Sequence, residues 1–393
     1  MNNLLNKIFF RSQNHNYINL GFKDIKKKTE VGKIFSAFNS FSKNSEIRYV
    51  GGCVRKIINR ETVDDIDLAV NLKPKDVCDA LNKKNIKYYE SGIEHGTITA
   101  LINNIKFEIT SLRKDIDTDG RHAKVEFSEN WKEDASRRDF TINSIYADIE
   151  GGLFDPFDGK KDLENGKVDF IGDVEVRIKE DYLRVLRYVR FFLNYSKDKH
   201  NPKVINAIKR NLSGVLAISS ERLLDEFQKL LKSKGFLKLA KDKDSLEIIN
   251  LIFTQLKNIS IFSKLNNFAE KNFSKVDFIF LISLLVIDGT DNVDYFIYKF
   301  NLSKKDKRRL LFLNSFYSEK FTNKIFLEKN LNKIFYFNGR EALMDIIYFK
   351  IFKSKKVDNK LLKLIEIFKA KVTPVMPIKA NIPVSYTHLT LPT

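Results

Sequence analysis

The order of apolar and polar positions divides the chain into regions of different secondary structure. Residues 1–30 are polar and read as irregular, and residues 31–41 have the spacing of an amphipathic helix. Strand patterns follow at Ile47–Val50, which runs into two glycines, and at Val63–Val70, where acidic and apolar residues alternate. A small sheet with helices packed on it is therefore expected to begin near residue 31.

A hairpin is the clearest local prediction in this part of the chain. Thr97–Ile102 and Ile105–Thr110 both have strand patterns, and they flank the pair Asn103–Asn104. Asparagine tolerates the left-handed backbone that two-residue hairpin turns require. Up to about residue 150 the chain is predicted to form a small mixed α/β sheet domain.

After residue 155 the strand patterns fade and helical patterns take over. The predicted helices are Asp181–Leu193, Pro202–Leu212, Ser220–Leu231 and most of residues 240–370. The fold class expected from these patterns is α+β, a small mixed β-sheet head followed by an elongated all-α part. A chain of 393 residues has room for two to four domains.

Charge is unevenly spread along the chain. The net charge is +19, but residues 1–150 hold 25 basic and 22 acidic side chains, whereas the rest holds 44 and 28. A polyanion is one partner that fits such an excess. A general bias toward Lys, Asn and Ile explains it equally well.

Compartment and membrane association are constrained by a few residues. Two cysteines, Cys53 and Cys78, cannot form a disulfide framework or a four-cysteine zinc site, so a cytoplasmic location is expected. The strongest apolar run, Phe278–Ile287, is about half of what a bilayer requires. Residues 1–10 lack the features of a secretory signal, and no membrane partner is predicted.

A Gly-Gly turn is the first candidate for chemistry. Gly51 and Gly52 follow a predicted strand and precede a short apolar helix that contains Arg55. Such a turn lets backbone N–H groups approach a phosphate, and Arg55 would hold its charge. By itself the motif is more often only a tight turn.

Acidic residues provide the second candidate. Asp65 and Asp67 are two apart, so on a strand they project from the same face. Close carboxylates favour a cation between them, and oxygen ligands favour Mg²⁺. Glu108, on the second strand of the hairpin, would add a third carboxylate, and such a set could hold two metals roughly 3.5–4 Å apart. Taken alone, a solvated acidic strand explains the pattern better.

The order of these motifs resembles the polymerase-β-like nucleotidyltransferases, and further motifs narrow the resemblance to the tRNA nucleotidyltransferase (CCA-adding) family, bacterial and eukaryotic branch. They extend from residue 48 to about 230 and are Glu94–Thr97, Glu108–Arg113, Asp117–Ala123, Arg137–Asn143, Asp155–Gly159, Glu180–Phe191 and Glu221–Arg222. Thr373–Ile378 is similar to the start of the tail in alphaproteobacterial members.

The resemblance implies addition of C, C and A to the 3′ end of tRNA from CTP and ATP. Asp65 and Asp67 would bind Mg²⁺ with help from Glu108. Arg138 would contact the triphosphate, and Asp139 would accept the ribose 2′-OH. Residues 111–127 resemble the flexible loop of the family, which is thought to serve the switch to ATP.

The segment Glu180–Phe191 would select the incoming base. Asp181 and Arg184 are three apart and are expected to share one helical face. For an arbitrary helix this is an ion pair, but the resemblance makes it a reader of the edge that C and A share. Arg187 continues the row and is included among the nucleotide-binding residues, whereas Arg190 is expected to contact backbone or neighbouring helices.

Five segments result from this interpretation. Residues 1–30 are an N-terminal extension, 31–150 the nucleotidyltransferase head, and 151–235 a helical neck that binds the base and the RNA 3′ end. Residues 236–381 are an incomplete helical body and tail for tRNA binding. Ala380–Thr393 carry no charged residue, and Val384–Thr393 resemble translated sequencing-adapter read-through. The last twelve residues, 382–393, are therefore expected to be foreign to the fold.

Departures and alternatives remain. Lys56 stands where the family usually has Asp. A poly(A) polymerase shares the scaffold but usually has arginines where this chain has residues 106–110, and a CC-only enzyme would lack the loop at 111–127. An A-only enzyme stays open. A catalytically inactive RNA-binding protein is less consistent with the intact Asp65 and Asp67.

Overall fold

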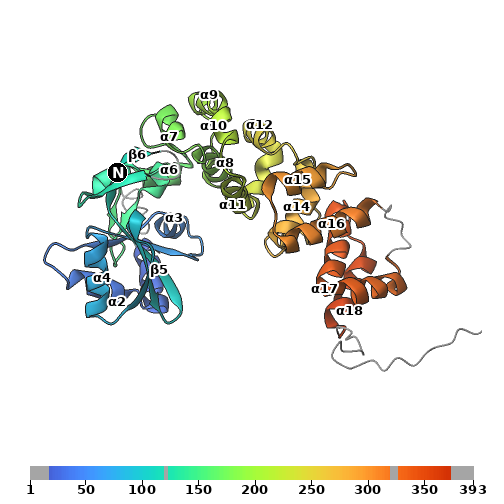
Figure 1. The fold of residues 1–393 in the computed structure, drawn as a ribbon, viewed down its shortest axis with the longest axis horizontal. Helices are drawn as coiled ribbons and strands as arrows, with labels where there is room; N and C mark the ends of the chain where they lie inside the picture. Colours follow the sequence, from blue (N-terminus) through green and yellow to red (C-terminus); the bar gives the residue numbers. More distant parts are fainter. Residues whose placement is uncertain (1–16, 119–122, 319–325, 373–393) are drawn as a thin grey trace, which may run out of the picture. The chain divides into compact units, whose positions relative to one another are not determined.

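The protein is described here by a computed structural model, which covers residues 17–118, 123–318 and 326–372. The chain forms two compact units, Met1–Ile252 and Phe253–Thr393. All strands of the described residues lie in the first unit, and the second is helical (Figure 1). The predicted α+β class, a sheet-containing head followed by helices, is confirmed.

Seven strands form the main sheet of the first unit. They are β1 Ile47–Val50, β2 Ile66–Val70, β3 Lys87–Gly92, β4 Thr97–Ile102, β5 Ile105–Ser111, β8 Tyr146–Ala147 and β9 Leu153–Phe154, in the order β3-β4-β5-β2-β1-β8-β9. A separate ribbon pairs β6 Arg113–Thr118 with β7 Ala123–Phe127. Only β2 and β5 pair in parallel among these neighbours of the described sheet, and their register places Asp67 beside Glu108.

The predicted hairpin is confirmed. β4 and β5 pair antiparallel from Thr97 opposite Thr110 to Ile102 opposite Ile105. Asn103 and Asn104 have φ angles of 49° and 65°, the left-handed conformation of a two-residue turn.

Helices of the first unit pack on the sheet and continue beyond it. They comprise residues 17–29, α2 Gly32–Asn39, α3 Gly52–Ile58, α4 Pro74–Lys83, α5 Trp131–Ser136, α6 Gly159–Asn165, α7 Val174–Glu180, α8 Arg184–Tyr195, α9 Pro202–Arg210, α10 Leu212–Leu216, α11 Ser220–Leu231 and α12 Lys243–Ile252, with 3₁₀ turns η1 Ile93–His95, η2 Thr141–Asn143 and η3 Lys234–Lys241. The helix predicted at Ser220–Leu231 is found with those bounds.

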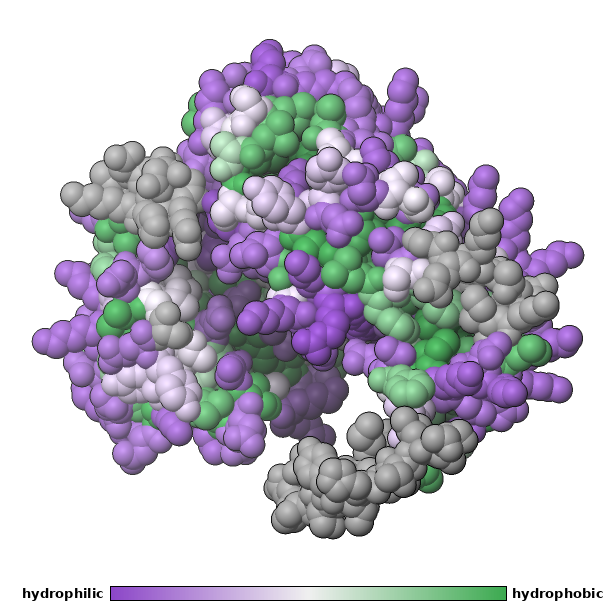
Figure 2. All heavy atoms as spheres, turned by 45° about the vertical axis from the view of Figure 1, so that its right-hand side comes forward, coloured by the Kyte–Doolittle hydropathy of each residue, from purple (hydrophilic) through white to green (hydrophobic). Residues whose placement is uncertain are grey.

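The second unit is built from helices. They are η4 Ile259–Ser263, α13 Asn267–Asn272, α14 Phe278–Val286, α15 Asn292–Phe300, α16 Lys304–Ser318, α17 Glu328–Lys353, which bends at Gly339, and α18 Asn359–Ala370. Every residue of α14 is buried, so the apolar run at this point is a core helix. None of the helices in the described part of the chain is long and apolar enough to cross a membrane. In the view of Figure 2, hydrophilic side chains cover much of the surface and small apolar patches lie between them.

The interpretation of residues 1–30 as irregular is wrong for residues 17–29, which are helical. Ile18, Phe22 and Ile25 of this helix are buried, and the Phe22 ring lies 4.8 Å from the ring of Tyr49 in β1. Apolar residues recur at intervals of three and four among many lysines and polar residues, so one narrow stripe packs on the sheet. The polar composition concealed this stripe.

We predict that Phe22→Ala lowers the free energy of unfolding of the first unit by about 3–5 kcal/mol, because it leaves a cavity against Tyr49. Leu20→Ala on the same helix, where the side chain is exposed, should change it by less than about 0.5 kcal/mol. Urea denaturation followed by circular dichroism measures both values. Equal effects of the two substitutions would show that the helix does not pack through this face.

Candidate active site

A cavity of about 740 Å³ opens in the first unit beside the strand–turn–helix formed by β1, Gly51 and α3. Ten of the predicted site residues line it, namely Gly51, Gly52, Arg55, Asp65, Asp67, Arg138, Asp139, Asp181, Arg184 and Arg187. Glu108 is not among the lining residues, but its backbone pairs with that of Asp67. The structure thus brings together residues that lie up to 136 positions apart in the sequence.

Glycine at positions 51 and 52 keeps one wall of the cavity bare. Gly51 has φ 67° and ψ −118°, a conformation that side-chain-bearing residues rarely adopt. A Cβ atom at Gly51 would lie 3.6 Å from Nη1 of Arg138, and one at Gly52 would lie 4.0 Å from Oδ2 of Asp67. The turn therefore leaves room for a ligand between an arginine and a carboxylate.

The predicted acidic pair lies at the cavity, although its backbone differs from the expectation. β2 begins at Ile66, so Asp65 precedes the strand instead of belonging to it. Burial, together with the negative charges of Glu108 and Asp65, raises the pKa of Asp67 to about 6. These carboxylates therefore repel each other, which is the electrostatic condition that a bound cation relieves.

Metal-ligand geometry itself is not preformed. Among the described residues, no group of three or more His, Cys, Asp or Glu side chains is arranged so that it could hold a metal ion. The donor set that fits a divalent cation consists of the Asp65 and Asp67 oxygens, with Glu108 as the neighbouring charge.

Arg55 is held inside the wall of the cavity. Its guanidinium donates to Oδ1 of Asn143 and lies 4.7 Å from the ring centre of Phe191. Asn143 in turn donates to Oδ1 of Asp139, at 2.9 Å. Arg55 thus connects α3 to η2 and α8, and this connection was not predicted.

Asp139 is buried and forms an ion pair with Arg187. Oδ2 of Asp139 lies 2.6 Å from Nη2 of Arg187, while Oδ1 accepts hydrogen bonds from Asn143 and from the Phe140 amide. Burial would raise the pKa of Asp139, but the Arg187 charge and these hydrogen bonds hold it below its ordinary value. Asp139 is therefore an ionised acceptor at the cavity surface.

The prediction that Asp181 and Arg184 share a helical face is wrong. Asp181 is extended (φ −152°, ψ 104°) at the end of α7, and α8 begins at Arg184. Oδ1 of Asp181 accepts from the Leu183 amide and from Arg222, at 3.1 and 3.0 Å. Aspartate favours a position just before a helix because its side chain accepts a free N–H there.

Arg184 is held by a different carboxylate. Its Nη1 atom donates to Oε2 of Glu180 at 2.6 Å and to the carbonyl of Arg177 at 2.8 Å. Arg177 also donates to Glu180, and to the carbonyls of Arg137 and Arg138. Asp181 and Arg184 therefore reach the same cavity from separate networks.

The prediction that Arg190 contacts a neighbouring helix is confirmed. Its Nε atom lies 2.5 Å from Oε1 of Glu226 on the neighbouring helix α11, and the residue also lines the cavity. Lys56, which lines the cavity too, forms an ion pair with the exposed Asp64 at 2.8 Å.

Eight lining residues were missed as site residues, namely Lys56, Arg113, Arg137, Asn143, Glu180, Arg190, Phe191 and Lys229. Most lie inside the quoted motifs, so the motif spans were the signal that could have identified them. Lys229 carried no such signal, and Lys56 was interpreted only as a departure from the family motif. Nine basic and five acidic side chains line the cavity, and this formal excess of four positive charges suits a polyanionic ligand.

A buried carboxylate outside the lining, Asp134, organises part of this wall. It is 1% exposed, and its oxygens accept from Nε of Arg137 (2.8 Å), Nη2 of Arg138 (3.0 Å) and the hydroxyl of Tyr146 (2.7 Å). Burial alone would raise the pKa of Asp134, but the two arginines hold it well below its ordinary value. The sequence analysis assigned no role to this residue.

Known proteins resemble the chain both in amino-acid sequence and in fold. Residues 47–169 match the family described as Poly A polymerase head domain. Human mitochondrial CCA tRNA nucleotidyltransferase 1 is 44% identical over 191 residues, which is 48% of this chain and 44% of the human protein. The mouse protein of the same name is 37% identical over 276 residues, 69% of this chain and 62% of its own length.

The chain is a relative of the CCA-adding enzymes. A CCA-adding enzyme of Lactobacillus delbrueckii is 36% identical over 201 residues, 50% of this chain and 49% of that protein. Matches to these relatives span from 44% to 62% of their length, which is less than two thirds.

The fold is also that of solved CCA-adding enzymes. The Bacillus stearothermophilus enzyme in complex with CTP superposes with a TM-score of 0.68 at 20% identity, covering 87% of this chain and 83% of that one. The Thermotoga maritima CCA-adding enzyme complexed with tRNA gives 0.59 at 17% identity, covering 86% and 82%. The fold expected from the motifs is thus confirmed, and the proteins similar in sequence bear the name of the family that the motifs resemble.

We predict that Asp134→Asn lowers the free energy of unfolding by about 3–5 kcal/mol near neutral pH, because two arginines lose a buried partner. Since the folded-state pKa of Asp134 is depressed, its stabilising effect is complete above the unfolded pKa of about 3.9 and is lost as pH falls toward the folded value. Urea denaturation between pH 8 and 3 should show a constant difference down to about pH 5 and a narrowing one below pH 4. A difference that does not narrow would contradict this assignment.

Proposed function

We propose that the chain adds C, C and A to the 3′ end of tRNA from CTP and ATP without a template. The observation that carries this proposal is the cavity, where Asp65 and Asp67 lie beside the bare Gly51–Gly52 turn and a positively charged wall. The relatives that bear the name CCA-adding enzyme, and the solved relative with bound CTP, support it.

A divalent cation, Mg²⁺ in our proposal, would be held by Asp65 and Asp67. Such a cation supplies charge stabilisation at the reacting phosphate. The chain contributes neighbouring carboxylates, and the charges of Glu108 and Asp65 that raise the pKa of Asp67 are charges that a cation would compensate. A cation beside Asp67 would lower the pKa of this carboxyl group, because an opposite charge favours its ionised form.

The triphosphate is expected to lie along the Gly51–Gly52 turn, where Nη1 of Arg138 faces the open space. Arg138 is available as a fixed donor because Asp134 binds the other edge of its guanidinium. Asp139 would accept the ribose 2′-OH, and its ionised state makes it a strong acceptor. Arg187 limits where Asp139 can turn, since the two are paired.

The base would be read by Asp181 and Arg184. A carboxylate oxygen accepts from the exocyclic NH₂ of C or A, and a guanidinium donates to the ring nitrogen beside it. G and U present the reverse pattern and would meet unpaired groups. We expect Oδ2 of Asp181 to make the first contact, because its Oδ1 holds Leu183 and Arg222.

The RNA is expected to bind through the basic part of the chain. Residues after 150 contain 44 basic and 28 acidic side chains, and phosphate contacts of that kind release counterions. We place the activity in the cytoplasm, since both cysteines are free and buried. The segments implied by the motifs, with the head at 31–150 and the neck at 151–235, remain part of this proposal.

The alternatives use the same scaffold, as the description Poly A polymerase head domain indicates. Purified protein, CTP, ATP and tRNA lacking CCA should yield tRNA ending in CCA, which sequencing of the 3′ ends would detect. A run of A would indicate a poly(A) polymerase, and a single A on tRNA ending in CC an A-only enzyme. Either result would replace the proposed function, and no incorporation at all would refute it.

We predict that Asp65→Ala and Asp67→Ala each abolish incorporation of both nucleotides while tRNA binding persists, because the basic region supplies most phosphate contacts. Asp64→Ala is the matched control, since Asp64 is exposed and pairs with Lys56. Single-nucleotide incorporation and filter binding measure the two properties. Turnover retained in both cavity variants would contradict the proposed roles.

For base selection we predict that Arg184→Gln lowers CTP incorporation by about 10- to 100-fold, since it removes a charge-assisted hydrogen bond. The preference for C over U should narrow at the same time. Arg210→Gln, at an exposed arginine paired with Glu175, should have neither effect. Assays with each of the four nucleoside triphosphates measure the preference, and an unchanged order of the four would place selection elsewhere.

A further inference from the structure

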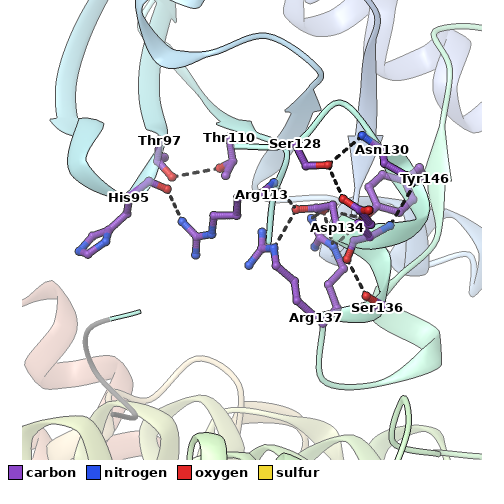
Figure 3. A network of polar contacts seen from close by, with 12 residues as sticks. His95, Thr97, Thr110, Arg113, Ser128, Asn130, Asp134, Ser136, Arg137 and Tyr146 are labelled. Carbon is purple, nitrogen blue, oxygen red and sulfur yellow. Dashed lines mark hydrogen bonds and ion pairs between the residues drawn. The ribbon is translucent and has the colours of Figure 1, made fainter. Parts of the chain in front are cut away.

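Asp134 joins three parts of the first unit that are separate in the sequence. It lies on the short helix α5, and its oxygens face the beginning of β6, Arg137 and Tyr146 of β8 (Figure 3). They also accept from Arg138, which follows Arg137. The carboxylate is 1% exposed, so it is not itself a group that a ligand reaches. Its contacts determine the positions of groups that a ligand does reach.

Asp134 holds the guanidinium groups of both arginines. Asp134 binds Nε of Arg137 at 2.8 Å, and binds Nε and Nη2 of Arg138 at 3.3 and 3.0 Å. Nη1 of Arg138 is left at the Gly51 side of the cavity. Tyr146 adds to this hold, since its oxygen lies 3.0 Å from Nε of Arg138 and 2.7 Å from Oδ2 of Asp134.

The same carboxylate also holds one end of the β6–β7 ribbon. Oδ1 of Asp134 accepts from the backbone amide of Arg113, the first residue of β6, at 3.3 Å. The Arg113 side chain in turn donates to the carbonyl of His95, which follows β3 (Figure 3). The ribbon and the two arginines therefore share one buried acceptor.

We propose that Asp134 is the positioning residue that fixes Arg137 and Arg138 for the triphosphate of the incoming nucleotide. This inference rests on the proposed function, because it assumes that the cavity binds a nucleoside triphosphate. Long arginine side chains lose conformational freedom when they bind a ligand. A carboxylate partner that already orders the side chain makes this loss smaller when the ligand binds. The effect should therefore depend on the phosphates of the ligand and not on its base.

The test compares Asp134→Asn with Asp345→Asn in the full-length chain. Asp345 is a matched control: it is 4% exposed and binds Arg309 through both oxygens, at 2.5 and 2.8 Å, in the second unit. Calorimetry would measure the affinity of each variant for CTP, CMP and inorganic triphosphate. Asp134→Asn should lower the affinity for CTP and for inorganic triphosphate by about tenfold or more, and the affinity for CMP by less than about twofold. We expect this difference because the substitution removes the charge-assisted hydrogen bonds that hold the two arginines.

Tyr146→Phe keeps the inference testable if Asp134→Asn fails to fold. It removes the hydroxyl group that contacts both Asp134 and Arg138. The affinity for CTP should fall two- to fivefold, which is the scale of a single hydrogen bond, and the affinity for CMP should not change. Asp134→Glu retains the charge and should recover part of the CTP affinity that Asn loses.

The experiment distinguishes failure of the positioning role of Asp134 from failure of the proposed function. If the wild-type chain binds CTP and extends tRNA, but Asp134→Asn and Asp345→Asn change CTP and CMP affinity alike, the positioning role is refuted and the proposed function stands. If the wild-type chain binds neither CTP nor inorganic triphosphate, the proposed function fails with it. If only the Asp134 and Tyr146 variants lose affinity for CTP and inorganic triphosphate, the inference is supported.

Discussion

Buried and half-buried carboxylates hold the arginines around the cavity, and the rest of the site depends on this arrangement. Asp134 binds Arg137 and Arg138, Glu180 binds Arg184, Asp139 binds Arg187, and Glu226 binds Arg190. Like-charged guanidinium groups gathered around one space would otherwise repel and turn toward solvent. These carboxylates hold five of the cavity arginines in place before any phosphate arrives.

The sheet supplies the opposite charge at one side of the same space. The parallel pairing of β2 with β5 places Asp67 beside Glu108, and Asp65 precedes the strand. The Gly51–Gly52 turn separates these carboxylates from Arg138 without filling the gap. The cavity therefore combines carboxylates and arginines within a single unit of the chain, and this combination suits a cation–polyphosphate ligand.

Local patterns predicted what local interactions decide. The hairpin at Asn103–Asn104, the strand–turn–helix at Gly51 and the helix at Ser220–Leu231 followed from backbone preferences and periodicity. The motifs also identified most of the residues that line the cavity, because they mark the segments that meet there.

Features that depend on contacts between distant segments could not be read from the sequence. Asp181 has the spacing of a helical residue, but its carboxylate accepts the Leu183 amide and Arg222, so the helix begins after it. Asp134 lies in a charged stretch that looks solvated, and its burial depends on residues 113 and 146. The interpretation of residues 373–393, including the uncharged end, concerns a part of the chain outside the described residues.

The contacts of Arg177 have a consequence for how this part of the chain can be divided. Arg177 donates to the carbonyls of Arg137 and Arg138, and Phe140 packs against Phe170 and Phe191. A chain that ended at residue 169, where the family match ends, would lack Phe191 and Arg177. Phe140 would then lose its contact with the Phe191 ring, and the carbonyls of Arg137 and Arg138 would lose their donor. The boundary of the family match is therefore not a boundary of folding, because residues on both sides of position 169 share one set of contacts.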